Sequence, residues 1–266
     1  MDDSSLRAPD PKRNPDAPLL APARRAIHAV IPRDTRFKAY FRLLDTPVLS
    51  ELYVRSRGRL RNRRVRPATR LVLEGFPSSG NSYCLQAVLL ANPDLSPDDV
   101  NSHTHSPRVV ERAVKSSVPC IVIARDARDA VSSMVQRFVG VRLDSAFDYY
   151  THYYQRLMPI RDSFVVAPFE AVTADCSAVV ERCNQQFGSD LVTPKAAGIT
   201  SERVWQEIEG RQRRRHGALK EQMISRPTAS RKSAAEVLSD LTPAEDRAMR
   251  RAIETHRAFI QGSPLR

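Results

Sequence analysis

The chain has 266 residues, a length that suits one domain with extensions, and its hydrophobic fraction of 41% is enough to form a core. It carries 42 Lys and Arg against 30 Asp and Glu, and the resulting net charge of +12 favours anionic partners such as nucleic acid, anionic lipid or an acidic small molecule. No apolar run approaches the ~20 residues of a membrane-spanning helix, and the first residues lack the pattern of a secretory signal, so we expect a cytoplasmic protein.

Residues 1–69 are predicted to form an N-terminal extension. Residues 1–25 hold five prolines and mixed charge, which predicts a disordered or loosely attached segment. Aromatic and leucine side chains at partly helical spacing predict a helix within 36–54, and a run of arginines from Arg55 to Arg70 follows it. Two interpretations remain open: this region lies peripherally on an anionic membrane, or the helix packs on the domain and the basic run is a solvated linker.

Residues 70–266 are predicted to form the main domain. We expect strands over 71–76, 119–124 and 163–168, and helices over 82–91, 107–116, 126–138, 146–157, 170–187 and 242–259. Residues 98–107 are expected to be an irregular polar stretch, and Thr242 and Glu245 to form a capping box before the last helix. Alternating strands and helices predict a three-layer α/β fold, in which helices flank a parallel sheet on both faces.

The four cysteines do not have the spacing of a metal site. Cys84 and Cys120 lie in a predicted helix and a predicted strand, while Cys176 and Cys183 are seven residues apart. We therefore expect free, buried thiols and no bound metal.

Residues 75–82 follow the first predicted strand and read Gly-Phe-Pro-Ser-Ser-Gly-Asn-Ser. Gly75, Gly80 and Ser82 fit the phosphate-loop pattern, in which backbone N–H groups at a helix N-terminus hold a phosphate or sulfate group. Asn81 stands where a nucleoside triphosphatase needs lysine against the terminal phosphates. The loop therefore predicts an anion cradle and argues against a phosphotransferase, which remains an alternative.

An arginine and a hydroxyl lie at the next strand–helix junction. Arg125 closes the second core strand at the edge where open α/β sheets bind ligands, and Ser133 lies about two turns into the following helix. Arginine as a charged fork and serine as a neutral donor suit a second phosphate. The alternative is an ion pair at the start of the helix, involving Asp126 or Asp129.

Two histidines lie between these junctions, at His103 and His105. A histidine beside the loop is suited to take a proton from an attacking hydroxyl group. Because they lie two residues apart on an extended segment, we expect the two rings to point in opposite directions, so that at most one faces the loop.

Taken in order, the motifs resemble those of the sulfotransferases that use 3′-phosphoadenosine 5′-phosphosulfate. The matching pieces are Phe76–Ser82, Thr104–Pro107, Arg125 with Ser133, Phe169–Glu170 and, more weakly, Arg231–Ser233. They cover residues 70–190 well and 225–245 loosely, and the first 69 residues have no counterpart. Each motif is short, and their joint order and spacing makes the resemblance specific.

The resemblance implies a phosphate-loop-like architecture and transfer of a sulfuryl group to a hydroxyl or amine acceptor, such as a sugar, glycolipid, phenol or small metabolite. It implies His105 as the catalytic base. It also implies a set of cofactor-binding residues: Ser78, Ser79, Gly80, Asn81 and Ser82 for the 5′-phosphosulfate, Arg125 and Ser133 for the 3′-phosphate, with Arg231 and Lys232 as helpers. No metal and no specific nucleic acid is expected.

One position departs from the family pattern. The family commonly has a cation where this chain has Ser78, to stabilise charge on the leaving phosphate. Another cation would have to replace it, and Arg108, Lys115 and Arg128 are the candidates. Otherwise the chain is a catalytically weak or inactive relative that binds the cofactor. A basic nucleic-acid-binding module is the alternative from another class, although the chain lacks an aromatic platform or recognition motif.

Overall fold

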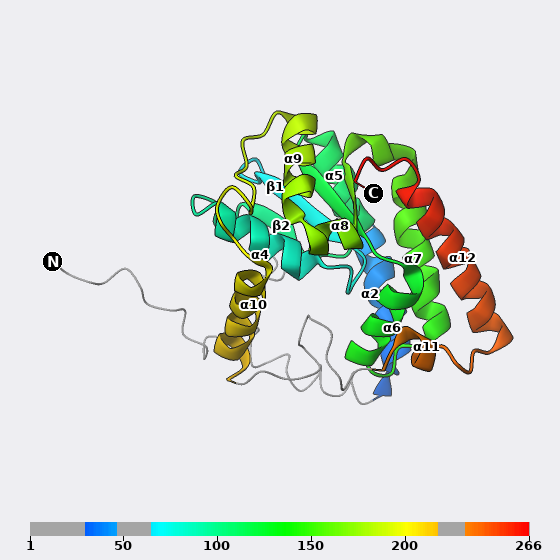
Figure 1. Cartoon of the computed structure of the whole chain (residues 1–266). Helices are drawn as coiled ribbons and strands as arrows, with labels where there is room; N and C mark the ends of the chain where they lie inside the picture. The colour runs from blue at the N-terminus through cyan, green and yellow to red at the C-terminus, as the bar shows by residue number, and fades with distance from the viewer. Residues whose placement is uncertain (1–29, 47–64, 218–231, 266) are drawn as a thin grey trace.

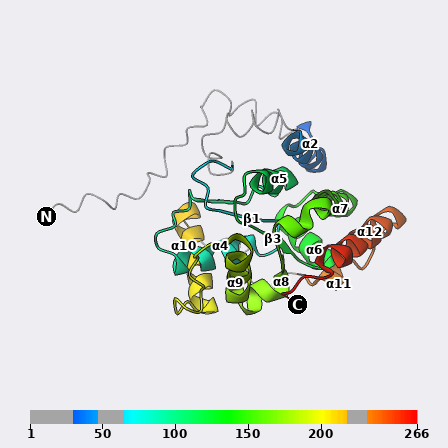
Figure 2. The same ribbon diagram turned by 90° about the horizontal axis from the view of Figure 1, so that it is seen from above.

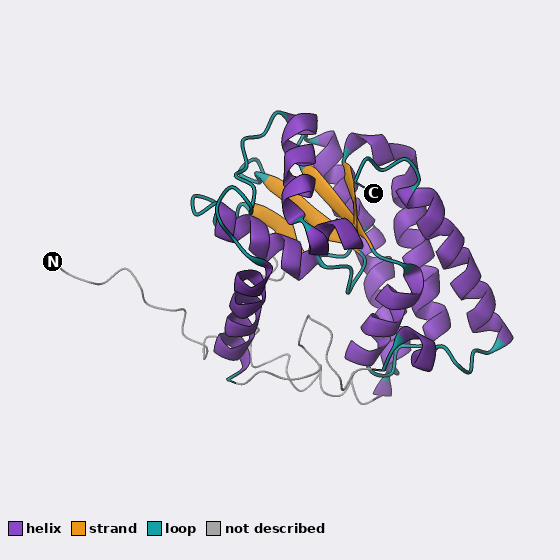
Figure 3. Cartoon of the chain, in the orientation of Figure 1, coloured by secondary structure: helices purple, strands orange, loops and turns teal. Residues whose placement is uncertain are grey.

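A parallel sheet of four strands lies at the centre of the molecule (Figures 1 and 3). The computed structural model describes residues 30–46, 65–217 and 232–265. The strands are β1 (Leu71–Gly75), β2 (Val100–Ser102), β3 (Cys120–Ala124) and β4 (Val165–Pro168), in the spatial order β2-β1-β3-β4. All three pairings are parallel, so the carboxyl ends of the strands meet at one edge of the sheet.

The strands are buried on both faces because their side chains alternate between two apolar clusters. Val72 and Val122 belong to one cluster, whereas Leu73 and Ile121 belong to the other. The first cluster includes residues of α5 (Pro107–Lys115), α6 (Ala127–Arg137), α7 (Leu143–Leu157) and α12 (Pro243–Ile260). The second includes residues of α4 (Asn81–Ala91), α8 (Phe169–Ala174), α9 (Cys176–Phe187) and α10 (Ser201–His216). Figure 2 shows α5 and α7 on one side of the sheet and α4 and α9 on the other, which confirms the predicted α/β class.

Most predicted elements lie within three residues of the observed bounds. The capping box before α12 is confirmed, because Thr242 Oγ1 and Glu245 exchange hydrogen bonds with each other's backbone. The predicted helix 170–187 is instead two helices, since Asp175 interrupts it and its carboxylate caps α9 by accepting from Ser177 N. The stretch expected to be irregular contains β2, which the apolar Val100 alone did not reveal.

The helix α2 (Arg33–Asp45) lies in the predicted extension and packs on the main domain (Figure 1). Phe41 stacks on Tyr149 of α7 with 3.7 Å between ring centroids, and Leu44 is also buried. The packed interpretation is therefore confirmed for this helix. Residues 1–29 and most of the arginine run lie outside the described residues, but Arg70 pairs with Asp94 at 2.8 Å.

Candidate functional site

The loop between β1 and α4 makes a tight turn at the carboxyl edge of the sheet. Gly80 has a φ of 93° where α4 begins, and Ser78 has a φ of 67°. Both values lie in the left-handed region, which glycine accepts and serine rarely adopts. At Gly75 the chain passes so close to β3 that an added Cβ would lie 2.5 Å from Ile123 O. The glycine spacing noted in the sequence thus has a direct steric reason.

Several features of this loop fit an anion. The first turn of α4 contains no acidic residue, and N–H groups in the first turn of a helix lack acceptors within the helix. The Ser78 hydroxyl, which can donate to an anion, is buried and has no hydrogen-bond partner in the described part of the chain. Ser79 N, however, donates to Phe76 O at 3.2 Å and so closes the turn, although we had expected it among the donors.

A buried carboxylate holds the segment that carries His105. Glu74 lies in β1 with no exposed surface, and its Oε1 accepts from Thr104 N at 2.8 Å and from Thr104 Oγ1 at 2.7 Å. Its Oε2 accepts from His105 N at 3.0 Å. The Tyr149 hydroxyl donates to His105 O. A buried carboxylate is stable only when several donors satisfy it, and here Thr104 and His105 supply three of them. These hydrogen bonds therefore fix the backbone of the segment against β1.

The geometry of His105 defines which ring nitrogen carries its hydrogen. His105 Nδ1 lies 2.8 Å from Gly75 O, which can only accept a hydrogen bond. Nδ1 therefore carries the hydrogen, and Nε2 is the nitrogen that can accept a proton. Asn81 Nδ2 donates to the same carbonyl at 3.2 Å, so the first residue of α4 and the histidine share one anchor. This tautomer is the one that a general base at Nε2 requires.

The expectation that the two histidines point in opposite directions is wrong. His103 has a φ of 60° and His105 a φ of 54°, so the segment is not regularly extended. Their rings lie edge to face with 5.9 Å between centroids, and His103 Nε2 lies 2.9 Å from Ser82 Oγ. Both histidines therefore contact the first turn of α4.

Arg125 also reaches the loop. Its Nη1 donates to Ser78 O at 3.0 Å, and its guanidinium lies 4.5 Å from the centroid of the Phe169 ring. Phe169 is the first residue of α8, as predicted, and its ring is so near Gly80 that an added Cβ would lie 3.1 Å away. The Tyr150 hydroxyl holds the Arg125 carbonyl at 2.5 Å. The predicted arginine is thus fixed beside the loop.

Two other predicted cofactor residues, Ser133 and Lys232, lie on or near α6. Ser133 is partly exposed on this helix, which begins two residues after Arg125. Lys232 exchanges two backbone hydrogen bonds with the Gln136 side chain, at 3.0 and 3.1 Å, so its segment lies within one helical turn of Ser133. The Lys232 side chain is exposed, and Arg231 lies outside the described residues.

Two of the three cations proposed to replace a charge at Ser78 are directed elsewhere. Arg108 Nε donates to Asp45 O at 2.6 Å, and Arg128 pairs with Asp126 at 3.1 Å. Lys115 is exposed at the end of α5. A different cation contacts the loop in the described structure: Arg125 donates to Ser78 O.

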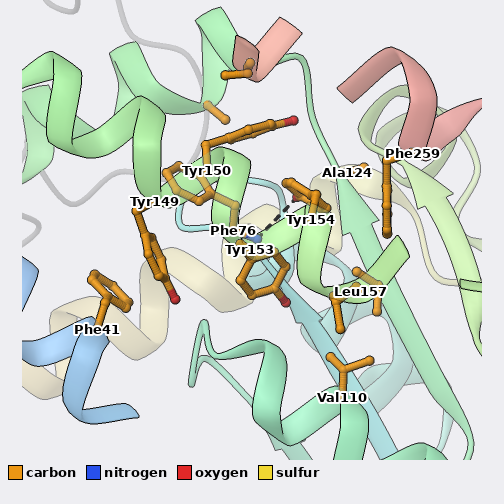
Figure 4. Close-up of a cluster of buried hydrophobic side chains, with 14 of the residues drawn as sticks. Phe41, Phe76, Val110, Ala124, Tyr149, Tyr150, Tyr153, Tyr154, Leu157 and Phe259 are labelled. Carbon is orange, nitrogen blue, oxygen red and sulfur yellow. Dashed lines mark hydrogen bonds between the residues drawn. The ribbon is translucent and has the colours of Figure 1, made fainter. Parts of the chain in front are cut away.

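Tyrosine side chains of α7 hold the segments that carry the site, a role that we did not assign to them from the sequence. Figure 4 shows these tyrosines in a buried cluster with Phe41 and Phe76. Tyr149 and Tyr150 bind the carbonyls of His105 and Arg125, and Tyr154 donates to Ile123 O at 2.8 Å. Burial raises the pKa of each of these phenols, so they remain protonated donors at neutral pH. A cluster of tyrosines at helical spacing was the available signal, since a buried phenol usually finds an acceptor.

The cysteines are free and buried, as expected. Within residues 30–46, 65–217 and 232–265, no group of three or more His, Cys, Asp or Glu side chains is arranged to hold a metal ion. The helices in these ranges also lack the combination of length and apolar composition needed to cross a membrane.

Neither a scan against models of protein families nor a search of curated proteins finds a match to the chain.

Proposed function

We propose that the protein transfers a sulfuryl group from 3′-phosphoadenosine 5′-phosphosulfate to a hydroxyl or amine acceptor. The observation that carries this proposal is the geometry of His105. Its Nδ1–H is bound to Gly75 O at the start of the loop, and its backbone is held by Glu74. A base candidate is thus fixed beside an anion cradle, which is the pairing that transfer of an anionic group to a hydroxyl requires.

The residues have distinct roles in this proposal. Gly80, Asn81 and Ser82 hold the 5′-phosphosulfate through the first turn of α4, with the Ser78 and Ser79 hydroxyls beside them. His105 Nε2 takes the proton of the acceptor. The cofactor supplies the activated sulfuryl group, and the chain contributes position and charge.

Arg125 and Ser133 hold the 3′-phosphate, and Lys232 assists from the segment beside α6. Arg231, outside the described residues, is proposed as a further helper. Arg125 stacks on Phe169 and contacts Ser78 O, so its charge also lies next to the loop that lacks a lysine. In this proposal residues 70–266 form a domain of the phosphate-loop-like sulfotransferase architecture. The protein acts in the cytoplasm, on a carbohydrate, glycolipid or other small acceptor.

A transfer assay with labelled donor and a panel of sugars, glycolipids, phenols and amines tests the proposal. We expect His105→Asn to lower turnover by about 10²-fold, the usual contribution of a positioned general base. Asparagine suits this position because it tolerates the left-handed backbone at His105.

The matched control is His152→Asn on α7, because His152 is exposed and pairs with Asp45 away from the loop. Its turnover should equal that of the unmodified protein. Full turnover in His105→Asn, or absence of transfer to every acceptor class by the unmodified protein, would count against the proposed activity.

A further inference from the structure

His103 contacts the anion cradle through a serine hydroxyl. Its Nε2 lies 2.9 Å from Ser82 Oγ, and its Nδ1 lies 2.9 Å from Ser102 Oγ. Hydroxyl groups accept as well as donate hydrogen bonds. His103 can therefore carry hydrogens on both ring nitrogens and keep both of these partners, so its surroundings are compatible with the charged imidazolium form.

An imidazolium at His103 would add a second positive charge to the cradle, beside Arg125, which contacts the loop at Ser78 O. Ser78 stands where a cation would be expected, and Arg108 and Arg128 bind Asp45 and Asp126 instead. When His103 donates to Ser82 Oγ, the Ser82 hydroxyl hydrogen becomes directed to an anion at the N-terminus of α4. Hydrogen bonds in such a chain polarise one another, and a charged donor at its end strengthens the next bond.

We propose that His103 in its imidazolium form is the proton-dependent cation of the loop, acting on the bound 5′-phosphosulfate through the Ser82 hydroxyl. This inference rests on the proposed function and adds a positioning residue to it. Binding of the anion favours the protonated ring, so affinity for the 5′-phosphosulfate falls as the pH rises and the ring loses its proton. His105 as base requires the opposite state, so turnover should depend on pH with a maximum.

Titratable groups near His103 in the described part of the chain include His105, whose ring centroid is 5.9 Å away, and Glu74, which accepts from Thr104 N and His105 N. Protonation of His105 would also attract an anion. The test must therefore separate the two histidines, which share a left-handed backbone and so accept the same replacement.

The test is a calorimetric titration with adenosine 5′-phosphosulfate from about pH 5.5 to about pH 8, a range in which a histidine changes charge. The phosphosulfate group has a constant charge there, because its remaining acid groups are strong. We expect the unmodified protein to bind about tenfold more weakly at the upper end of this range. His103→Asn should bind weakly at every pH, whereas His105→Asn should keep the pH dependence.

Ser82→Ala provides a second variant, which removes the hydroxyl between the ring and the anion and should also abolish the pH dependence. A pH dependence that persists in His103→Asn, or that disappears in His105→Asn, overturns the inference while leaving the proposed function intact. Failure of the unmodified protein to bind either the phosphosulfate or adenosine 3′,5′-bisphosphate at any pH overturns both.

Discussion

At the scale of single residues, Glu74 organises the site without lying in any of its motifs. It is a carboxylate inside a buried strand, and each of its oxygens accepts from the segment that carries His105. Removing its charge would leave donors without a matching acceptor, and a buried unsatisfied donor costs about 1–3 kcal/mol. The residue therefore links the stability of the sheet edge to the position of the proposed base.

We expect Glu74→Gln to lower the free energy of unfolding by about 2 kcal/mol and to reduce turnover, because the amide NH₂ would face Thr104 and His105 donors. Denaturant unfolding and the transfer assay measure the two effects. The matched control is Glu111→Gln on α5, where a carboxylate binds Arg156 at 2.6 Å away from the loop. If Glu111→Gln lowered turnover as much as Glu74→Gln does, Glu74 would have no special relation to the site.

Sequence alone could predict those site residues that lie in short motifs with fixed spacing. Gly75, Gly80 and Arg125 are of this kind, since a tight turn or a strand end determines their place. Glu74 could not be predicted, because its partners lie 30 residues further along the chain. The direction of His103 was mispredicted because residues at i and i+2 of an extended segment share a side of the backbone, so their spacing did not imply opposite directions.

At the scale of elements, α7 supports the site through its tyrosines. Tyr149, Tyr150 and Tyr154 donate to backbone carbonyls at the carboxyl edge of the sheet. The neighbouring Tyr153 is equally buried, but its hydroxyl has no partner within the described residues. Tyr149, whose hydroxyl makes a hydrogen bond, and Tyr153, whose hydroxyl makes none in the described residues, can therefore be compared by the same substitution.

We expect Tyr149→Phe to cost about 1 kcal/mol of unfolding free energy and to lower turnover, because it releases the His105 carbonyl. Tyr153→Phe should leave both quantities nearly unchanged, since it removes a hydroxyl that makes no hydrogen bond there. Chemical denaturation and the transfer assay are the measurements. A larger loss of turnover in Tyr153→Phe than in Tyr149→Phe would show that the hydrogen bond does not position His105.

Elements with strong periodicity or long apolar runs could be predicted, whereas short ones could not. The strands β1 and β3 are continuous apolar runs apart from one carboxylate, and the sequence therefore indicated them. The strand β2 has three residues, two of them polar, and depends on pairing with β1 rather than on its own composition. Similarly, the break between α8 and α9 depends on Asp175 acting as a cap. From sequence alone, this aspartate could equally be an exposed residue within one continuous helix.

At the scale of the whole molecule, the layers bring distant segments to one edge of the sheet. The loop after β1, the histidine segment after β2, Arg125 after β3 and Phe169 after β4 all lie where the parallel strands end. Ligands of open α/β sheets bind at this edge. The net charge of +12 adds a general attraction for anions. Binding of one anion is therefore weak support for a specific site, and a difference in affinity between similar anions is stronger support.

We expect the carboxyl edge of the sheet to bind a nucleotide that has a 3′-phosphate and an anionic group at the 5′ position. Calorimetric titration with adenosine 3′,5′-bisphosphate, compared with adenosine 5′-monophosphate and ATP, tests it most directly. Arg125→Ala is the informative variant, and Arg128→Ala is its control, because Arg128 pairs with Asp126 and is exposed.

We predict that the bisphosphate binds at least about tenfold more tightly than the monophosphate or ATP, because it alone satisfies both phosphate positions. Arg125→Ala should lose about 2 kcal/mol of this affinity, the usual value for a charge-assisted hydrogen bond, and Arg128→Ala should lose none. Equal affinity for the three nucleotides, or undiminished bisphosphate affinity in Arg125→Ala, would contradict the account.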